Sequence, residues 1–246
     1  MPPLPGRGRS DYYGVKTGTL RPAVVAATRG VESAVTIVFA NRADAGRQLA
    51  PRLESLRGCD AVVVGLPRGG VPVAFEVARA LGAPLDVIVV RKLGVPSEPE
   101  VAMGAIGERG ARVLNDDVIA QLGVSARQRE VVEDRERVRL DARVALLRGG
   151  RARVDLAGRV VIIVDDGIAT GATARVACQV ARRFGATRVV IAVPVAPDIT
   201  SLALGADEVI CVFVPEWFTA VGAYYRDYAP TTDDQVVALL ASGELS

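Results

Sequence analysis

The sequence predicts an α/β protein built on a doubly wound, mainly parallel sheet. Three observations predict it. Short apolar runs rich in β-branched residues recur along the chain, and they alternate with segments whose apolar residues are spaced as in helices. The runs lack polar alternation, which is typical of strands that are covered on both faces. The chain has 246 residues, of which 50% are hydrophobic, so it can bury a large core.

The elements follow from this alternation. Residues 1–34 begin with a Pro/Gly/Arg-rich stretch and show no sustained period, so we expect a poorly ordered N-terminal extension. One domain is expected over 35–246. Strands are predicted where apolar runs occur, at 35–40, 61–66, 85–90, 160–164, 188–195 and 208–214. Helical spacing predicts helices at 42–56, 71–81, 116–122, 126–147, 172–184, near 199–204 and at 233–240.

Between these elements, residues 91–112 predict a long connection. Its part at 94–109 is polar and contains Gly and Pro, and long loops of this kind are uncommon unless they are functional. We expect it to be flexible and to close over a ligand. The helix at 126–147 is dense in Arg and Glu, which indicates a partly exposed amphipathic helix that allows a homodimer contact.

The bulk composition excludes several classes of protein. The formal net charge is +2, so no nucleic-acid partner is expected, and no apolar run reaches the roughly 20 residues of a membrane span. Histidine is absent, which removes Ser-His and Cys-His nucleophile systems. The three cysteines fit no zinc spacing and indicate reduced thiols, so we expect a cytoplasmic protein without a membrane partner.

The most informative segment is residues 160–173. It begins with five apolar residues, continues with the acid pair Asp165 and Asp166, and ends in a turn of small and hydroxyl-bearing residues before a predicted helix. Open α/β sheets bind ligands at the carboxyl ends of their strands, where this acid pair is expected. Backbone N–H groups of the turn and the helix N-terminus can bind an anion. A phosphorylated sugar suits this combination, with a cradle formed by Gly167, Ile168, Ala169, Thr170, Gly171, Ala172 and Thr173.

This segment resembles the binding signature of the type I phosphoribosyltransferases, and it contains neither a Walker A motif nor G-x-G-x-x-G. The resemblance covers about residues 36–241. It implies that 5-phosphoribosyl-1-diphosphate is the ligand and that its phosphoribosyl group passes to a nitrogenous acceptor with release of pyrophosphate. It also implies Mg²⁺, with Asp165 and Asp166 holding the ribose hydroxyls and the outer shell of the metal, and a small hood over about 213–241. In some members of the family the acidic position also assists proton removal from the acceptor, and the resemblance gives this role to Asp166.

Two further segments fit the diphosphate. Residues 65–74 close a predicted strand and open a helix, and in the family the pyrophosphate loop lies at this strand end. The resemblance therefore implies that Arg68, Gly69 and Gly70 contact pyrophosphate. Arg91 and Lys92 follow the next predicted strand and resemble the start of the flexible loop in adenine-type members, so they are expected to stabilise the leaving diphosphate.

An aromatic segment near the C-terminus supplies the third predicted site. Residues 214–228 hold five of the eleven aromatic residues and resemble the hood of hypoxanthine-type members. The resemblance implies that Phe218 stacks on the acceptor ring, with Trp217 as the second choice, and that Asp227 reaches a ring substituent or the metal shell. In the 6-oxopurine members of the family, a lysine beside the corresponding strand reads the carbonyl of the base. Residues 189–195 contain no lysine, so a 6-oxopurine acceptor is not favoured.

Two other functions remain open at this point. A regulatory protein could bind phosphoribosyl-diphosphate without reacting it; residues 1–34 carry five cations, although no helix-turn-helix module is evident. A hydrolase or kinase-like phosphosugar enzyme is the third reading, but no nucleophile or Walker lysine supports it. Salt-dependent DNA binding would distinguish the regulator from the transferase.

Overall fold

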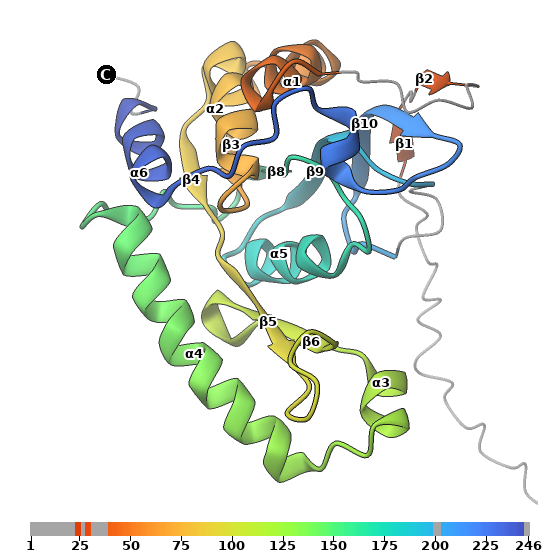
Figure 1. Cartoon of the computed structure of the whole chain (residues 1–246). Helices are drawn as coiled ribbons and strands as arrows, with labels where there is room; N and C mark the ends of the chain where they lie inside the picture. The colour runs from red at the N-terminus through yellow and green to blue at the C-terminus, as the bar shows by residue number, and fades with distance from the viewer. Residues whose placement is uncertain (1–22, 26–27, 31–38, 199–202, 244–246) are drawn as a thin grey trace, which may run out of the picture.

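The computed structural model describes residues 23–25, 28–30, 39–198 and 203–243. Its main sheet has the strand order β1-β10-β9-β8-β3-β4, with β2 also paired to β10, and every pair is parallel (Figure 1). The strands are β1 (Ala23–Val25), β2 (Thr28–Gly30), β3 (Ala61–Gly65), β4 (Leu85–Val87), β8 (Val160–Val164), β9 (Arg188–Val195) and β10 (Glu208–Pro215). The predicted doubly wound parallel sheet is therefore confirmed.

Helices cover both faces of this sheet. They are α1 (Arg42–Leu49), 3-10 helix η1 (Ala50–Leu56), α2 (Gly70–Leu81), α5 (Ala172–Arg183), 3-10 helix η4 (Val221–Tyr224) and α6 (Asp233–Ser242). The helix predicted over 42–56 changes to 3-10 geometry at Ala50, next to Pro51, whose missing N–H cannot continue the α-helical pattern. In Figure 1, α1 and α2 lie on one side of the sheet and α5 on the other.

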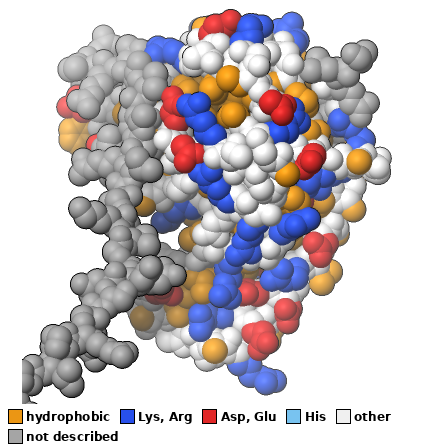
Figure 2. Space-filling view, turned by 180° about the vertical axis from the view of Figure 1, so that it is seen from behind, with side chains coloured by type: hydrophobic (Ala, Val, Ile, Leu, Met, Phe, Trp, Pro, Cys, Tyr) orange, Lys and Arg blue, Asp and Glu red, His pale blue; other side chains and the backbone are white. Residues whose placement is uncertain are grey.

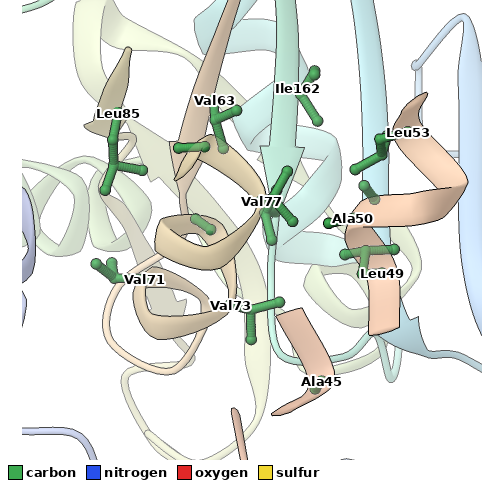
Figure 3. Close-up of a cluster of buried hydrophobic side chains, with 14 of the residues drawn as sticks. Ala45, Leu49, Ala50, Leu53, Val63, Val71, Val73, Val77, Leu85 and Ile162 are labelled. Carbon is green, nitrogen blue, oxygen red and sulfur yellow. The ribbon is translucent and has the colours of Figure 1, made fainter. Parts of the chain in front are cut away.

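Successive side chains of each strand point to opposite faces of the sheet, and each face has its own hydrophobic core. Val63 and Ile162 belong to the cluster on the side of α1 and α2, and Val62 and Val161 belong to the cluster on the side of α5. Figure 3 shows the first cluster, where side chains of the two helices pack against Val63 and Ile162. These four side chains are all buried, so successive strand positions contribute to one core and then the other.

Residues 90–148 form a separate arm that leaves the sheet after β4 and returns at β8. The arm contains an antiparallel sheet, a 3-10 helix and two α-helices: β5 (Val90–Gly94), β6 (Ala102–Gly107), 3-10 helix η2 (Glu108–Gly110), β7 (Arg112–Leu114), α3 (Asp116–Gln121) and α4 (Ala126–Arg148). It has its own core, made by Leu93, Val95, Met103, Ile106, Val124 and Val132. Strand β6 lies inside the predicted loop 94–109, so that segment is partly sheet, and the connection from β5 to β6 is only residues 95–101.

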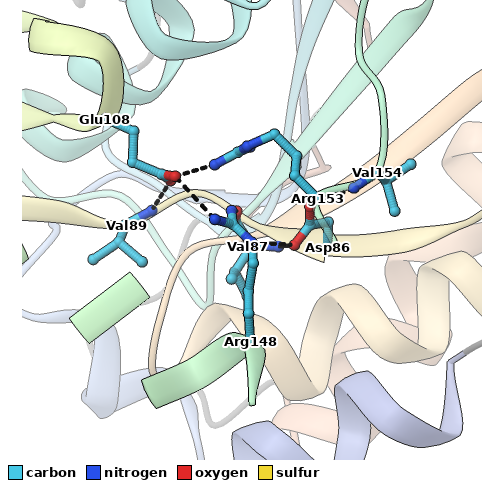
Figure 4. A network of polar contacts seen from close by, with 7 residues as sticks. All are labelled: Asp86, Val87, Val89, Glu108, Arg148, Arg153 and Val154. Carbon is cyan, nitrogen blue, oxygen red and sulfur yellow. Dashed lines mark hydrogen bonds and ion pairs between the residues drawn. The ribbon is translucent and has the colours of Figure 1, made fainter. Parts of the chain in front are cut away.

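A buried ion network ties the arm to the main sheet (Figure 4). Arg148 at the end of α4 donates to Asp86 of β4 (3.3 Å), to Glu108 (3.1 Å) and to the carbonyl of Val87 (3.0 Å). Arg153 pairs with the same Glu108. The carboxylates Asp86 and Glu108 also accept the backbone N–H groups of Val154 and Val89. The network thus joins the strand that enters the arm to the segment that leaves it.

Some predicted elements lie partly or wholly outside the described residues, and two strands lie inside the predicted extension. Strands β1 and β2 lie within the segment predicted as an extension, and both pair with β10. Several predicted segments lie outside the described residues: the rest of residues 1–34, and most of the run at 35–40 and of the predicted helix near 199–204. Helix α4 leaves Val131, Val138 and Leu146 exposed, which is where the predicted homodimer contact would lie. No described helix has the length and hydropathy needed to span a bilayer.

Candidate functional site

The candidate site lies where the carboxyl ends of β3 and β8 meet. These neighbouring strands are in register, with Gly65 paired to Val164. From β3 the winding proceeds to β4 on one side, and from β8 it proceeds to β9 and β10 on the other. Such a reversal is where open α/β sheets bind ligands. The N–H of Leu66 donates to the carbonyl of Val164 (2.9 Å), so the loops that follow the two strands begin side by side.

The two glycines of the first loop press against the acid pair of the second. A Cβ at Gly69 would lie 2.0 Å from Oδ2 of Asp166, and a Cβ at Gly70 would lie 2.8 Å from Cα of Asp165. Any side chain at these positions would displace the carboxylates or the end of β8. The structure therefore brings together Gly69, Gly70, Asp165 and Asp166, as the sequence predicts for a common site.

Asp166 is held by residues that were not predicted as site residues. Its Oδ2 accepts from Nε of Arg42 (2.8 Å) and from the hydroxyl of Tyr228 (2.9 Å). Its backbone carbonyl accepts from the hydroxyl of Tyr225 (2.6 Å). These contacts join residues that are far apart in the sequence. In the sequence, Arg42 is only the first residue of a predicted helix, and the tyrosines are only members of an aromatic segment. A local signal exists only in Asn41, a helix-capping residue that places Arg42 at a helix start.

Asp165 has a different environment. Its Oδ1 accepts from the N–H of Asp166 (2.9 Å). Burial raises the pKa of Asp165 well above its usual range, and the neighbouring charge of Asp166 raises it further. Burial also raises the pKa of Tyr228 to about 12, with the charge of Asp166 as the next cause, so this phenol stays a hydrogen-bond donor. Burial opposes the charge on Arg42, but the hydrogen bonds and charges of Asp166 and Tyr228 together outweigh this effect and leave the pKa of Arg42 raised.

Residues 167–173 lead from the acid pair into α5. Gly171 takes a left-handed conformation (φ 75°) and directly precedes the helix, and as a glycine it has no side chain to cap the N-terminus. Ala169, Thr170 and Thr173 are exposed beside it. Ile168 faces inward instead: its side chain is buried and its N–H donates to the carbonyl of Val195 (3.0 Å). The turn can therefore present the N–H groups of the first helical turn and two hydroxyls to an anion.

Arg68 stands at the outer side of this site. The peptide bond between Pro67 and Arg68 is cis. The side chain of Arg68 is 51% exposed, and its guanidinium lies 3.8 Å from Asp233 at the start of α6. Asp233 also pairs with Arg143 of α4. Arg68 thus follows the same strand end as the glycine loop, and it can turn toward an anion because its ion pair with Asp233 is long and exposed.

Arg91 and Lys92 belong to a different place in the fold. Arg91 donates to Glu136 of α4 (2.7 Å), and Lys92 lies 3.5 Å from Glu100. Both line a cavity of about 350 Å³ between β5 and α4, whose lining includes none of residues 165–173. Burial opposes the charge of Glu136, but the hydrogen bonds and charges of Arg91 and Arg139 together outweigh it and keep the pKa of Glu136 below its usual range. The structure thus pairs these two cations with acidic residues of the arm, around a cavity that the acid pair does not line.

The three residues predicted to bind the acceptor differ in exposure. Phe218 is partly buried and stacks on Tyr224, with ring centroids 6.0 Å apart. Trp217 is 77% exposed. The carboxylate of Asp227 accepts the N–H of Ala229 (3.0 Å), which shapes the turn leading to Tyr228. All three lie between β10 and α6, in the same segment as the tyrosines that contact Asp166.

Metal binding depends on the donors present. Among the described residues there is no group of three or more His, Cys, Asp or Glu side chains able to hold an ion. Mg²⁺ is commonly held by one or two carboxylates together with substrate phosphates and water. The acid pair fits that outer role, because Asp165 and Asp166 sit beside the predicted phosphate cradle.

Comparison with known proteins identifies the family. A family model described as the phosphoribosyl transferase domain matches residues 35–229, so the chain belongs to the phosphoribosyl transferase family. Two curated proteins of Mycobacterium tuberculosis, MT0597 of strain CDC 1551 and Rv0571c of strain H37Rv, are 58% identical to it over 205 residues. Both are named, provisionally, as phosphoribosyl transferases. The match covers 82% of this chain and 46% of theirs, so this chain spans about half their length.

A solved structure supports the same placement. The crystal structure of TT1426 from Thermus thermophilus is 44% identical to this chain and superimposes with a TM-score of 0.71. The superposition covers 83% of this chain and 98% of that one. The resemblance inferred from the acid pair and its phosphate loop is thereby confirmed at the level of family and fold.

Proposed function

We propose that the protein transfers the 5-phosphoribosyl group of 5-phosphoribosyl-1-diphosphate to a nitrogenous acceptor and releases pyrophosphate. One observation carries the proposal. The loop with Gly69 and Gly70, the acid pair Asp165 and Asp166, and the N-terminus of α5 meet at the carboxyl ends of β3 and β8. A phosphorylated sugar diphosphate needs an anion cradle at each end and hydroxyl acceptors between them, in this order.

Each group has a role in this proposal. The N–H groups at the start of α5, with Thr170 and Thr173, bind the 5′-phosphate, and the glycine loop with Arg68 binds the diphosphate. Asp165 and Asp166 accept the ribose hydroxyls. Transfer of a phosphoribosyl group builds positive charge on the sugar carbon, so the carboxylates stabilise it and no histidine is required. Mg²⁺, when bound, neutralises the diphosphate, and the acid pair would hold its outer shell.

Acceptor binding is assigned to the segment after β10. Phe218 is proposed to stack on the acceptor ring, with Trp217 and Asp227 beside it, because this segment already reaches the acid pair through Tyr228. Arg91 and Lys92 are left out of the proposed site, since they line the cavity of the arm. A cytoplasmic location is also proposed, because the buried thiols of Cys178 and Cys211 are unpaired.

The test measures pyrophosphate release from phosphoribosyl-diphosphate and Mg²⁺ against a panel of nitrogenous bases. At least one base should accelerate release, and Asp165→Asn with Asp166→Asn should abolish it. The chain offers a matched control: Asp116 and Asp117 form another adjacent acid pair, exposed at the start of α3 in the arm. The double Asn variant of that pair should keep full activity.

The outcomes separate the alternatives. Tight binding of phosphoribosyl-diphosphate without release for any base would favour the regulatory function over the transferase. No binding at all, or equal loss in the two double variants, would contradict the proposed function.

A further inference from the structure

The proposed ribose site contains a clamp that the transferase assignment does not use. It consists of Arg42 at the start of α1 and Tyr228 in the segment before α6, which converge on one oxygen, Oδ2 of Asp166. The guanidinium of Arg42 lies 4.0 Å from the centre of the Tyr228 ring. The two side chains therefore contact each other as well as the carboxylate.

The clamp is anchored to backbone on both sides. Nη1 of Arg42 donates to the carbonyl of Ala229 (2.7 Å), one residue beyond Tyr228. The segment 224–229, here called the strap, runs alongside residues 39–40. Three backbone hydrogen bonds of 2.9–3.0 Å join them, from the N–H of Phe39 to Tyr224 and from the N–H groups of Arg226 and Asp227 to Phe39 and Ala40. Tyr225 adds a bond to the carbonyl of Asp166.

This arrangement leaves Asp166 little freedom. Only 11% of its side chain is exposed, as is 11% of the Arg42 side chain. Gly69 has no side chain, and this leaves space for Oδ2 of Asp166 and Nε of Arg42. A Cβ at Gly69 would lie 2.0 Å from the first atom and 3.0 Å from the second. The diphosphate loop, the end of β8 and the strap thus pack around one carboxylate.

We propose that Arg42 and Tyr228 are positioning residues that act through Asp166, fixing its carboxylate between the diphosphate loop and the strap. This inference rests on the proposed function. Its consequence is that the strap, which follows the predicted acceptor segment, is mechanically joined to the ribose site. Asp166 then orients the ribose with its remaining oxygen, whereas Asp165 approaches the ligand without such a clamp.

Arginine is suited to this task because its planar fork reaches Asp166 and Ala229 in fixed directions while its face stacks on a ring. Lysine has a single donor centre and cannot make all three contacts. Arg42→Lys is therefore expected to behave like Arg42→Gln and not like the wild type. A role that required only positive charge would predict rescue by lysine.

The test is a mutant cycle read by calorimetric binding of Mg²⁺ and phosphoribosyl-diphosphate, with urea unfolding measured in parallel. Tyr228→Phe should weaken binding about 10-fold, and Arg42→Gln about 10- to 100-fold, as expected when a partner of a buried charge is lost. The double variant of Arg42 and Asp166 shows whether Arg42 acts through Asp166. Because both residues act through the same carboxylate, adding Arg42→Gln to Asp166→Asn should change binding less than about twofold further.

The control is Arg47→Gln, further along α1, whose side chain is 52% exposed and pairs with Glu76. It should leave binding unchanged. If Arg42→Gln loses affinity equally in the wild-type and Asp166→Asn backgrounds, or if neither clamp variant binds more weakly, the inference is overturned while the proposed function stands. A wild-type protein that does not bind phosphoribosyl-diphosphate would instead refute the proposed function, on which this inference depends.

Discussion

A single methyl group at Gly70 would test whether the two loops form one site. The Cβ of Gly70→Ala would lie 2.6 Å from the carbonyl oxygen of Val164 and 2.8 Å from Cα of Asp165. Both are backbone atoms at the end of β8, and they cannot rotate away as a side chain would. Ordinary contact begins at 3.4 Å. The loop and the strand end must therefore separate by up to 0.8 Å, the difference between 3.4 and 2.6 Å.

The cost of this separation can be estimated for folding and for function. Overpacking of a filled site costs about 1–3 kcal/mol of stability. A misplacement of about 1 Å between catalytic or binding groups costs on the order of 10²-fold in rate. We therefore expect Gly70→Ala to unfold at lower urea concentration and to lose about 10²-fold in kcat/KM, or in affinity for Mg²⁺ and phosphoribosyl-diphosphate if no acceptor is known.

The matched control makes an equal clash elsewhere. Gly104→Ala would place its Cβ 2.4 Å from the carbonyl oxygen of Val113, inside the small sheet of the arm. It should cost similar stability and leave binding within about twofold. Equal affinity losses in the two variants, or full affinity in Gly70→Ala with its stability loss present, would refute the reasoning that the glycine loop sets the geometry of the acid pair.

Two further predictions concern stability. Arg148→Met should lower the free energy of unfolding in urea by about 3–5 kcal/mol, because it leaves Asp86 and Glu108 buried without their shared partner. The control is Arg139→Met on the same helix, where the arginine side chain is 56% exposed, and it should cost less than about 1 kcal/mol. Equal costs would refute a stabilising role for the buried network. Asp165→Asn should stabilise the fold at about pH 8 and not at about pH 4. Burial and the charge of Asp166 raise the pKa of Asp165, so the folded chain holds this proton more tightly than the unfolded chain, and stability is lost as pH rises through the raised value. Thermal melts of both proteins across this range would check it, and a gain that is independent of pH would count against it.

Much of the main sheet could be predicted because its strands are buried on both faces. Val160–Val164 is a continuous apolar run, and the structure has the strand at those residues. The arm was harder to predict for a physical reason. Its strands β5 and β6 include Arg91, Lys92 and several Gly and Ala residues, so their few core side chains, such as Leu93 and Met103, give no visible period.

The residues of the candidate site also divide into those that the sequence predicts and those that it does not. The acid pair, the glycine loop and the turn before α5 could be found because each motif is contiguous in sequence. The clamp could not, because Arg42 and Tyr228 are 186 positions apart and meet only through the fold. Arg91 and Lys92 show the converse: they follow the buried end of β4 in sequence, but the chain turns into the arm and carries them to the cavity beside α4.

The charge distribution also bears on the alternatives. On the face shown in Figure 2, basic and acidic side chains are interspersed, and the whole chain has a net charge of +2. Non-specific binding of nucleic acid depends on concentrated positive charge, so a salt-dependent DNA-binding measurement tests the regulatory alternative.

The most direct test of the proposed site is a crystal structure of the protein with Mg²⁺ and 5-phosphoribosyl-1-diphosphate. We expect the 5′-phosphate at the N-terminus of α5 within residues 167–173, the ribose hydroxyls against Asp165 and Asp166, and the diphosphate beside Gly69 and Gly70. Ligand density confined to the cavity between β5 and α4, with residues 165–173 empty, would contradict it.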